Sequence, residues 1–214
     1  QTGIHINYSE DYIHYLIALL FTFAVMPFTA QLMEWNLDIS LPSFMSEFEN
    51  QARATQDFVE ESTKHLVNLE GPVELILGVL VIAIVPAIGE ELLFRGFFQK
   101  YLIKGFGNVH VGIFVTAFLF SLFHLQIFVL LPRLLLGLVY GYFYQYSRNL
   151  LIPMTAHFVN NAFMVIMLYL YNQGMIDYNI EDESQVTLSM ALFSFAISAL
   201  LFFYLRLRYQ KLEA

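Results

Sequence analysis

The sequence contains no cysteine, and this absence removes several classes of protein from consideration. Without a thiol there is no disulfide framework, no thiolate nucleophile and no thiolate-bound zinc. Charged residues are also scarce, at 13% of the 214 residues, whereas a typical soluble domain carries about 25%. The net charge of -8 argues against nucleic acid as a partner.

Hydrophobic residues, in contrast, make up 58% of the chain, with 22 Phe and 13 Tyr among them. Six segments approach the length of about 20 apolar residues that a transmembrane helix needs. They cover residues 12–33, 75–102, 109–125, 129–146, 151–171 and 188–207. The sequence therefore predicts an all-α fold, a polytopic transmembrane helix bundle of about six spans. We expect residues 1–214 to form a single membrane domain.

A polar connection, residues 34–74, separates the first two apolar segments and holds nine acidic but only two basic residues. Within it Phe44, Phe48, Ala52 and Val59 recur at helical spacing. This pattern is typical of an amphipathic helix that lies on a bilayer surface. A helix that packs on its own protein would show the same pattern, so both interpretations stay open.

The basic residues gather after the second, fourth and sixth apolar segments, which six spans would place on one side of the membrane. These residues are Lys100, Lys104, Arg148, Arg206, Arg208 and Lys211. The acidic residues Asp177, Glu181, Asp182 and Glu183 fall on the other side, together with the 34–74 connection. The positive-inside rule puts the basic side, and with it both ends of the chain, in the cytoplasm.

Glu90, Glu91 and Arg95 lie inside the second apolar segment, where a carboxylate or guanidinium is costly and usually functional. Glu91 and Arg95 are four residues apart, so they share a helix face and can pair. Glu90 is rotated by about 100° from Glu91 and is free to face a cavity and handle protons. A purely structural ionic lock among the three residues is the alternative.

His124 ends an apolar run, and His157 and Asn161 share a helix face in the fifth segment. Together with Glu90 they fit two chemistries. In one, Glu90, His124 and His157 bind Zn²⁺, which activates water. In the other, Glu90 and His124 activate water without a metal, while His157 and Asn161 stabilise an oxyanion. Hydrogen bonding between helices would explain His157 and Asn161 without any catalysis.

A family resemblance follows from three motifs that occur in order along the chain. They are Glu90-Glu91-x-x-x-Arg95, Phe120-x-x-x-His124 and His157-x-x-x-Asn161. The chain resembles the CAAX prenyl protease and bacteriocin-processing family, the type II CAAX endopeptidases of the Abi type, over about residues 75–170. The resemblance implies an intramembrane endopeptidase, usually classed as a metalloprotease, acting on a peptide or protein substrate. It also implies that Glu90 activates the water with help from His124.

The site predicted in this way consists of five catalytic residues and one supporting residue. The catalytic residues are Glu90, Glu91, His124, His157 and Asn161, and Arg95 supports them. We expect the protein in a bacterial plasma membrane, in contact with lipid. Family membership leaves the substrate open, because some members are linked to immunity or scaffolding rather than to cleavage.

Two other functions compete with the protease. A catalytically silent scaffold or immunity protein would bind a peptide in the same cavity, and the intact motif residues count against it. A proton-coupled transporter would also bury Glu and His side chains. The transporter requires ionisable residues spread along a path through the bilayer, whereas hydrolysis requires Glu90, His124 and His157 to lie in one cluster.

Overall fold

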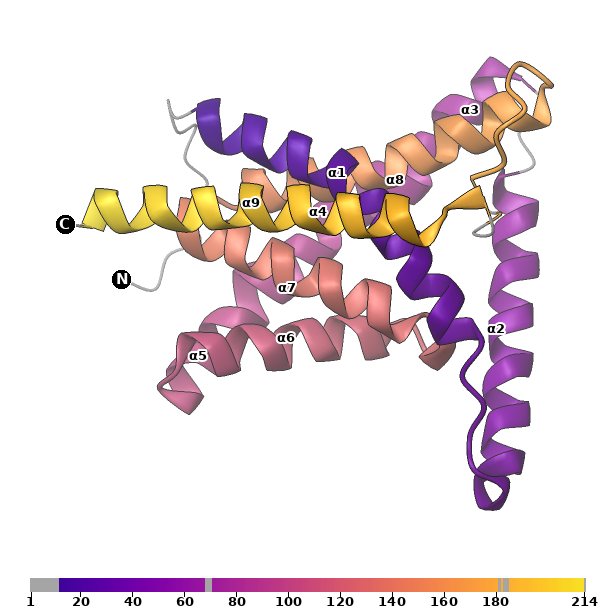
Figure 1. Ribbon diagram of the computed structural model, residues 1–214, viewed down its shortest axis with the longest axis horizontal. Helices are drawn as coiled ribbons and strands as arrows, with labels where there is room; N and C mark the ends of the chain where they lie inside the picture. Colours follow the sequence, from indigo (N-terminus) through magenta and orange to yellow (C-terminus); the bar gives the residue numbers. More distant parts are fainter. Residues whose placement is uncertain (1–11, 68–70, 181, 183–184, 214) are drawn as a thin grey trace.

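The chain folds into helices joined by short connections in the computed structural model, which describes residues 12–67, 71–180, 182 and 185–213 (Figure 1). Within these ranges there is no β-strand. The longer helices are α1 (Tyr12–Leu37), α2 (Ser46–Val67), α6 (Val109–Phe123), α7 (Leu130–Ser147), α8 (Leu151–Asn172) and α9 (Leu188–Glu213). Short 3-10 turns, η1 (Ser43–Met45) and η4 (Ile127–Val129), precede α2 and α7.

Among the described residues, five helices are long and apolar enough to cross a membrane, which makes this an integral membrane protein. They cover Tyr12–Leu37, Pro72–Phe106, Ile127–Ser147, Leu151–Asn172 and Leu188–Tyr209. The third predicted segment corresponds to α6, which has 15 residues and is shorter than a full span. The prediction of an all-α polytopic bundle is confirmed, with five full spans and one short apolar helix.

The second span is one helical run that alternates between α- and π-helical geometry. It contains α3 (Pro72–Gly78), η2 (Val79–Ile84), α4 (Val85–Glu91), η3 (Leu92–Phe98) and α5 (Gln99–Phe106), of which η2 and η3 are π-helical. π-Helical turns inside helices are rare and occur often at functional sites. Here they flank the α4 turn that carries Glu90 and Glu91.

Helices α6 and α7 approach each other closely because α7 has glycine at two positions four residues apart. A Cβ atom on Gly137 would lie 3.1 Å from the Cβ of Ala117, and one on Gly141 would lie 2.8 Å from Cγ2 of Ile113. Small residues at this spacing allow helix backbones to approach in membrane proteins. The contact leaves the carbonyls of both glycines open to side chains from the second span, as described below.

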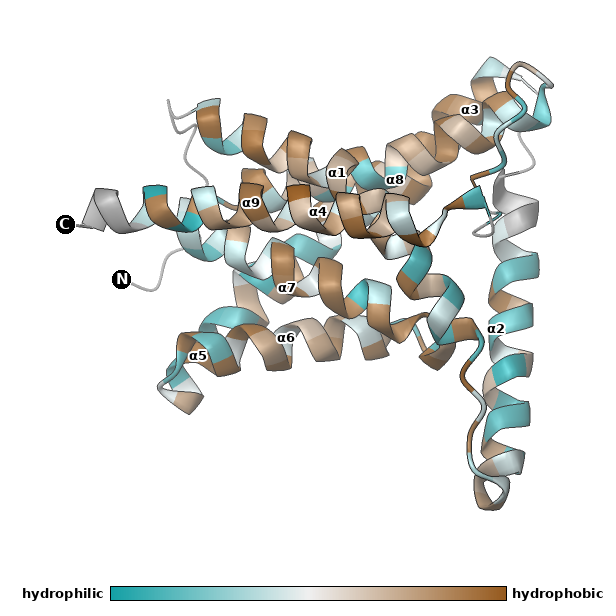
Figure 2. Ribbon diagram, in the orientation of Figure 1, coloured by the Kyte–Doolittle hydropathy of each residue, from teal (hydrophilic) through white to brown (hydrophobic). Residues whose placement is uncertain are grey.

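Helix α2 runs across one end of the bundle, roughly at right angles to α7 and α9 in this view (Figure 1). Its surface is mostly hydrophilic, whereas the spanning helices are mostly hydrophobic (Figure 2). It contacts the α6–α7 connection, where the Arg53 guanidinium lies 4.2 Å from the centre of the Phe128 ring. Arg53 also donates to Glu49 on α2 at 2.7 Å, and this hydrogen bond lowers the pKa of Glu49. The amphipathic helix therefore packs on its own protein through this face.

The orientation of the protein in the membrane stays a prediction. Three of the acidic residues on which it rests, Glu70, Glu181 and Glu183, and the N-terminal residues 1–11 lie outside the described residues. Ala54 on α2 and Lys104 on α5 are both exposed and lie in the two regions expected on opposite faces.

Cysteine scanning tests this orientation without background from the chain itself, because no native cysteine is present. We expect a membrane-impermeant thiol reagent to label Ala54→Cys in intact cells and to label Lys104→Cys only after the membrane is opened. Labelling of Lys104→Cys alone in intact cells would reverse the orientation. Equal labelling in opened membranes is the control for accessibility.

Candidate active site

Glu90, His124 and His157 come from three different helices and meet in one cluster. The Glu90 carboxylate lies between the two imidazoles, with Oε1 at 4.0 Å from Nε2 of His124 and Oε2 at 3.9 Å from Nε2 of His157. The side chain of Glu90 is 23% exposed and that of His157 only 7%. These three predicted residues therefore share one polar site, and they are not spread through the bilayer.

Glu91 is fully buried and joins Arg95 to His157. Arg95 Nη1 donates to Glu91 Oε1 at 2.8 Å, the pair that the four-residue spacing predicts. His157 Nδ1 lies 2.9 Å from the same carboxylate oxygen. The two adjacent glutamates thus have different surroundings. Glu91 Oε1 is held by a cation and an imidazole, whereas Glu90 Oε2 accepts no hydrogen bond from the part of the chain that the structure describes.

Arg95 connects this pair to two other helices. Its Nη2 donates to the carbonyl of Gly137 at 2.9 Å, and Gln99 donates one turn further on to the carbonyl of Gly141 at 3.0 Å. The guanidinium carbon also lies 4.8 Å from the centre of the Phe120 ring, a favourable cation–π distance. The Glu91–Arg95 pair therefore positions α6 and α7 against the second span.

The hydrogen bonds at the Nδ1 atoms determine which ring nitrogen carries the proton in each of the two histidines. The carbonyl of Phe120 can only accept a hydrogen bond, so His124 Nδ1, 2.9 Å away, carries a proton. His157 Nδ1 likewise carries a proton, because it donates a hydrogen bond to the Glu91 carboxylate. When neutral, each imidazole therefore presents the lone pair of its Nε2 toward Glu90. The spacing in Phe120-x-x-x-His124 has a direct role here, because the first motif residue orients the second.

Asn161 was expected to join this cluster, but its hydrogen bonds lead elsewhere. Its Nδ2 donates to the carbonyl of Ile82 at 3.1 Å, and its Oδ1 accepts from Asn160 at 3.1 Å. Pro86 lies four residues after Ile82 and has no N–H to give to that carbonyl. Asn161 therefore supplies the donor that the proline removes, at the π-helical turn before Glu90.

The donor atoms match zinc in type but not in spacing. A carboxylate and two Nε2 atoms whose Nδ1 atoms are bonded elsewhere form a common ligand set. Two ligands of a tetrahedral zinc lie about 3.4 Å apart, given bond lengths of about 2.0–2.1 Å. The measured separations of 3.9 and 4.0 Å are wider, and among the described residues no group of three His, Asp or Glu could hold a metal ion. As arranged here, the site does not fit the metal.

The separations do fit a water molecule. A water that bonds to two atoms at about 2.8 Å can bridge a gap of this size, and polar contacts beyond 3.5 Å often contain one. Glu90 would accept one proton of such a water, and a histidine Nε2 would accept the other. The arrangement can hold and polarise water next to a carboxylate base.

Sequence reasoning missed two residues near this cluster. Tyr140 stacks on His157, with ring centres 5.4 Å apart, and its buried hydroxyl has no hydrogen-bond partner among the described residues. Arg133 on α7 is close enough to Glu90 to interact electrostatically. An arginine inside an apolar segment is a signal that could have identified Arg133, whereas a tyrosine in a chain with 13 of them carries none.

Comparison with known proteins finds a family model that matches the segment carrying this site. Residues 72–163 match the family model described as Type II CAAX prenyl endopeptidase Rce1-like. The matched segment runs from the first turn of α3 to α8 and contains every predicted site residue. The family resemblance inferred from the three motifs is therefore confirmed for this segment.

One curated relative is the uncharacterized protein YpbD of Bacillus subtilis (strain 168), which is 27% identical over 90 residues. The match covers 39% of this chain and 42% of YpbD, so the chain spans less than half the length of that relative. No solved structure matches the chain.

Proposed function

We propose that this protein is an intramembrane endopeptidase in which Glu90 is the general base. The observation that carries the proposal is the placement of the Glu90 carboxylate between the Nε2 atoms of His124 and His157. The family match to endopeptidases over residues 72–163 supports it. The substrate is a peptide or protein that reaches the site within the membrane.

In the proposed reaction, Glu90 takes a proton from the bridging water while the water oxygen attacks the carbonyl carbon of the peptide bond. The resulting tetrahedral oxyanion needs a donor, and His157 supplies one when it is protonated on Nε2. The protonated Glu90 then gives its proton to the leaving nitrogen as the C–N bond breaks. One water is consumed, and a carboxylic acid and an amine are released.

Glu91, Arg95 and Asn161 act through other residues in this proposal. Glu91 orients His157 through the Nδ1 atom of the imidazole, and Arg95 holds the Glu91 carboxylate in place. Asn161 supports the helix turn that leads to Glu90, through the carbonyl of Ile82. This role differs from the oxyanion contact expected from the sequence, because Asn161 donates to the backbone carbonyl of Ile82 and accepts from Asn160.

The clustering of the ionisable residues favours hydrolysis over a proton pathway, because a transporter needs such groups along the whole span. A silent scaffold would keep the same geometry, so an activity measurement must separate the two. Comparison of peptides from cells with the wild-type protein and with Glu90→Ala would identify substrates. No difference between the two peptide sets would favour the scaffold.

Substitution of His124 tests the role of the cluster and the metal at the same time. We expect His124→Ala to slow cleavage of an identified substrate by about 10²-fold or more, because a proton acceptor beside the water is lost. The matched control is His110→Ala, since His110 lies on α6 but is exposed and bonds Tyr142.

The water mechanism further predicts that activity survives a strong chelator and that the purified protein holds no stoichiometric metal. Metal analysis and a cleavage assay after dialysis measure both. Loss of activity on chelation that Zn²⁺ restores, with metal content reduced in His124→Ala, would instead establish the zinc mechanism.

A further inference from the structure

Arg133 is a cation beside the catalytic cluster that lacks an anionic partner. Its Nη2 donates to the side-chain oxygen of Gln126 at 2.5 Å, whereas its Nη1 is buried without any hydrogen-bond partner. Among the described residues no carboxylate lies within 4.0 Å of this guanidinium, although Glu90 interacts with it electrostatically at longer range. Arg95, which is fully buried in the same site, has both a carboxylate and a backbone carbonyl as hydrogen-bond partners.

The position of Arg133 is set by a chain of side chains that begins on α2. Gln56 on α2 accepts a hydrogen bond from Gln126 Nε2 at 3.0 Å, which turns the Gln126 carbonyl oxygen toward Arg133. Asn36 holds the start of α7 by accepting from the backbone N–H of Leu131 at 2.8 Å. A guanidinium fixed in this way loses little conformational freedom when it binds a ligand.

A guanidinium N–H group that is buried without a hydrogen-bond partner is costly, so its presence next to the cluster points to an anion that arrives with the reaction. Arginine presents a planar fork of N–H donors that matches two oxygens of a carboxylate. With Nη2 engaged by Gln126, the buried Nη1 remains available to an oxygen anion.

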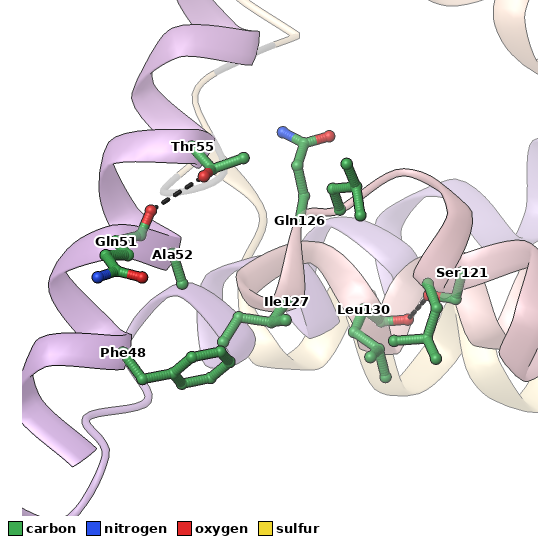
Figure 3. A pocket seen from close by; sticks show the side chains of 10 residues that line it. Phe48, Gln51, Ala52, Thr55, Ser121, Gln126, Ile127 and Leu130 are labelled. Atoms are coloured by element: carbon green, nitrogen blue, oxygen red, sulfur yellow. Dashed lines mark hydrogen bonds between the residues drawn. The ribbon is translucent and has the colours of Figure 1, made fainter.

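Gln126 also contacts a cavity of about 320 Å³ between α2 and the α6–α7 connection (Figure 3). Most of its lining is apolar, with Phe48, Leu122, Ile127 and Leu130 among the contributing residues. Its lining includes none of the three clustered residues Glu90, His124 and His157, so the cavity is separate from the cluster. It offers space for an apolar side chain next to the group that holds Arg133.

We propose that Arg133 binds an oxygen anion of the peptide, and that Gln126 and Gln56 are the positioning residues that hold it. The inference rests on the proposed function, because a peptide must occupy the site. Two sources can supply the anion. One is a carboxylate of the bound peptide, and the other is the oxyanion formed at the cleaved carbonyl.

Binding measurements test this proposal without requiring cleavage. The probes are a fluorescently labelled tetrapeptide of alternating Ala and Leu as the free acid, its C-terminal amide, and an amidated analogue with a phosphinate in place of the central peptide bond. Affinities are measured by fluorescence anisotropy with the intact protein in detergent. The proteins are the wild type, Arg133→Met and, as a matched control, Arg148→Met, whose arginine is exposed and contacts Tyr209.

If the anion is a peptide carboxylate, we expect the wild type to bind the free acid about 10- to 100-fold more tightly than the amide, the range of a charged hydrogen bond. If the anion is the oxyanion, the phosphinate analogue binds more tightly than the amide by the same factor. In each case Arg133→Met loses this increase in affinity, whereas Arg148→Met retains it. Equal gains in the wild type and Arg133→Met would overturn the proposal, as would no gain for either anionic probe.

Two further variants cover the case in which Arg133→Met does not fold. Arg133→Lys retains the charge and should keep part of the preference, whereas Gln126→Met releases the guanidinium and should reduce it. An unchanged preference in Gln126→Met would remove its positioning role. A cleavage assay on the wild type, run beside these binding measurements, separates the two proposals, because a wild-type protein that binds the anion but never cleaves would reject only the protease.

Discussion

Replacement of Glu90 by glutamine should abolish cleavage while leaving the fold intact. The substitution keeps the size of the side chain but removes its basicity, so the water between Glu90 and the histidines loses its proton acceptor. Loss of a general base of this kind reduces the rate on the order of 10²–10⁴-fold. Because Glu90 Oε2 accepts no hydrogen bond, the amide should be accommodated without breaking one there.

The measurement is the rate of cleavage of an identified substrate by purified protein, together with its thermal unfolding. Glu49→Gln is the matched control, since Glu49 on α2 pairs with Arg53 at 2.7 Å, outside the cluster. Wild-type function in cells that carry Glu90→Gln would reject the protease and favour the scaffold. A folded Glu90→Gln protein that still binds peptide would locate the defect in the chemical step.

Replacement of Arg95 by alanine should be the most destabilising single change near the site. It leaves Glu91 fully buried with no cation and removes the bond to the Gly137 carbonyl. Breaking a buried ion pair from one side costs about 3–5 kcal/mol, a large part of the total stability of a typical domain. We therefore expect a low yield of folded protein in detergent and a strongly lowered midpoint of thermal unfolding.

A double replacement separates stability from catalysis. Glu91→Leu combined with Arg95→Met removes both charges and fills most of the volume, so it should recover much of the stability that Arg95→Ala loses. It should remain inactive, because His157 no longer has the carboxylate that orients it. Normal yield and stability of Arg95→Ala would show that the pair is not structural, and Arg148→Ala serves as the exposed control.

Features that depend on one helix alone could be predicted from the sequence. The apolar segments defined the spans because helix length in a bilayer follows from residue count. The Glu91–Arg95 pair followed from the four-residue spacing, and the opposite direction of Glu90 followed from the helical rotation. The short α6 was the main deviation, since its 15 residues end at Phe123, directly before His124, rather than crossing fully.

Contacts between helices could not be predicted from the sequence, because they depend on tertiary packing and not on the spacing of residues within one helix. Only the tertiary structure showed that His157 shares the Glu91 carboxylate with Arg95, and that Asn161 serves the carbonyl left open by Pro86. The unpartnered Nη1 of Arg133 also emerged only there. The sequence alone determined the membrane bundle and the three motifs. The packing of α2, α6, α7 and α8 against the second span decided what each motif residue contacts, because these partners lie far apart in the chain.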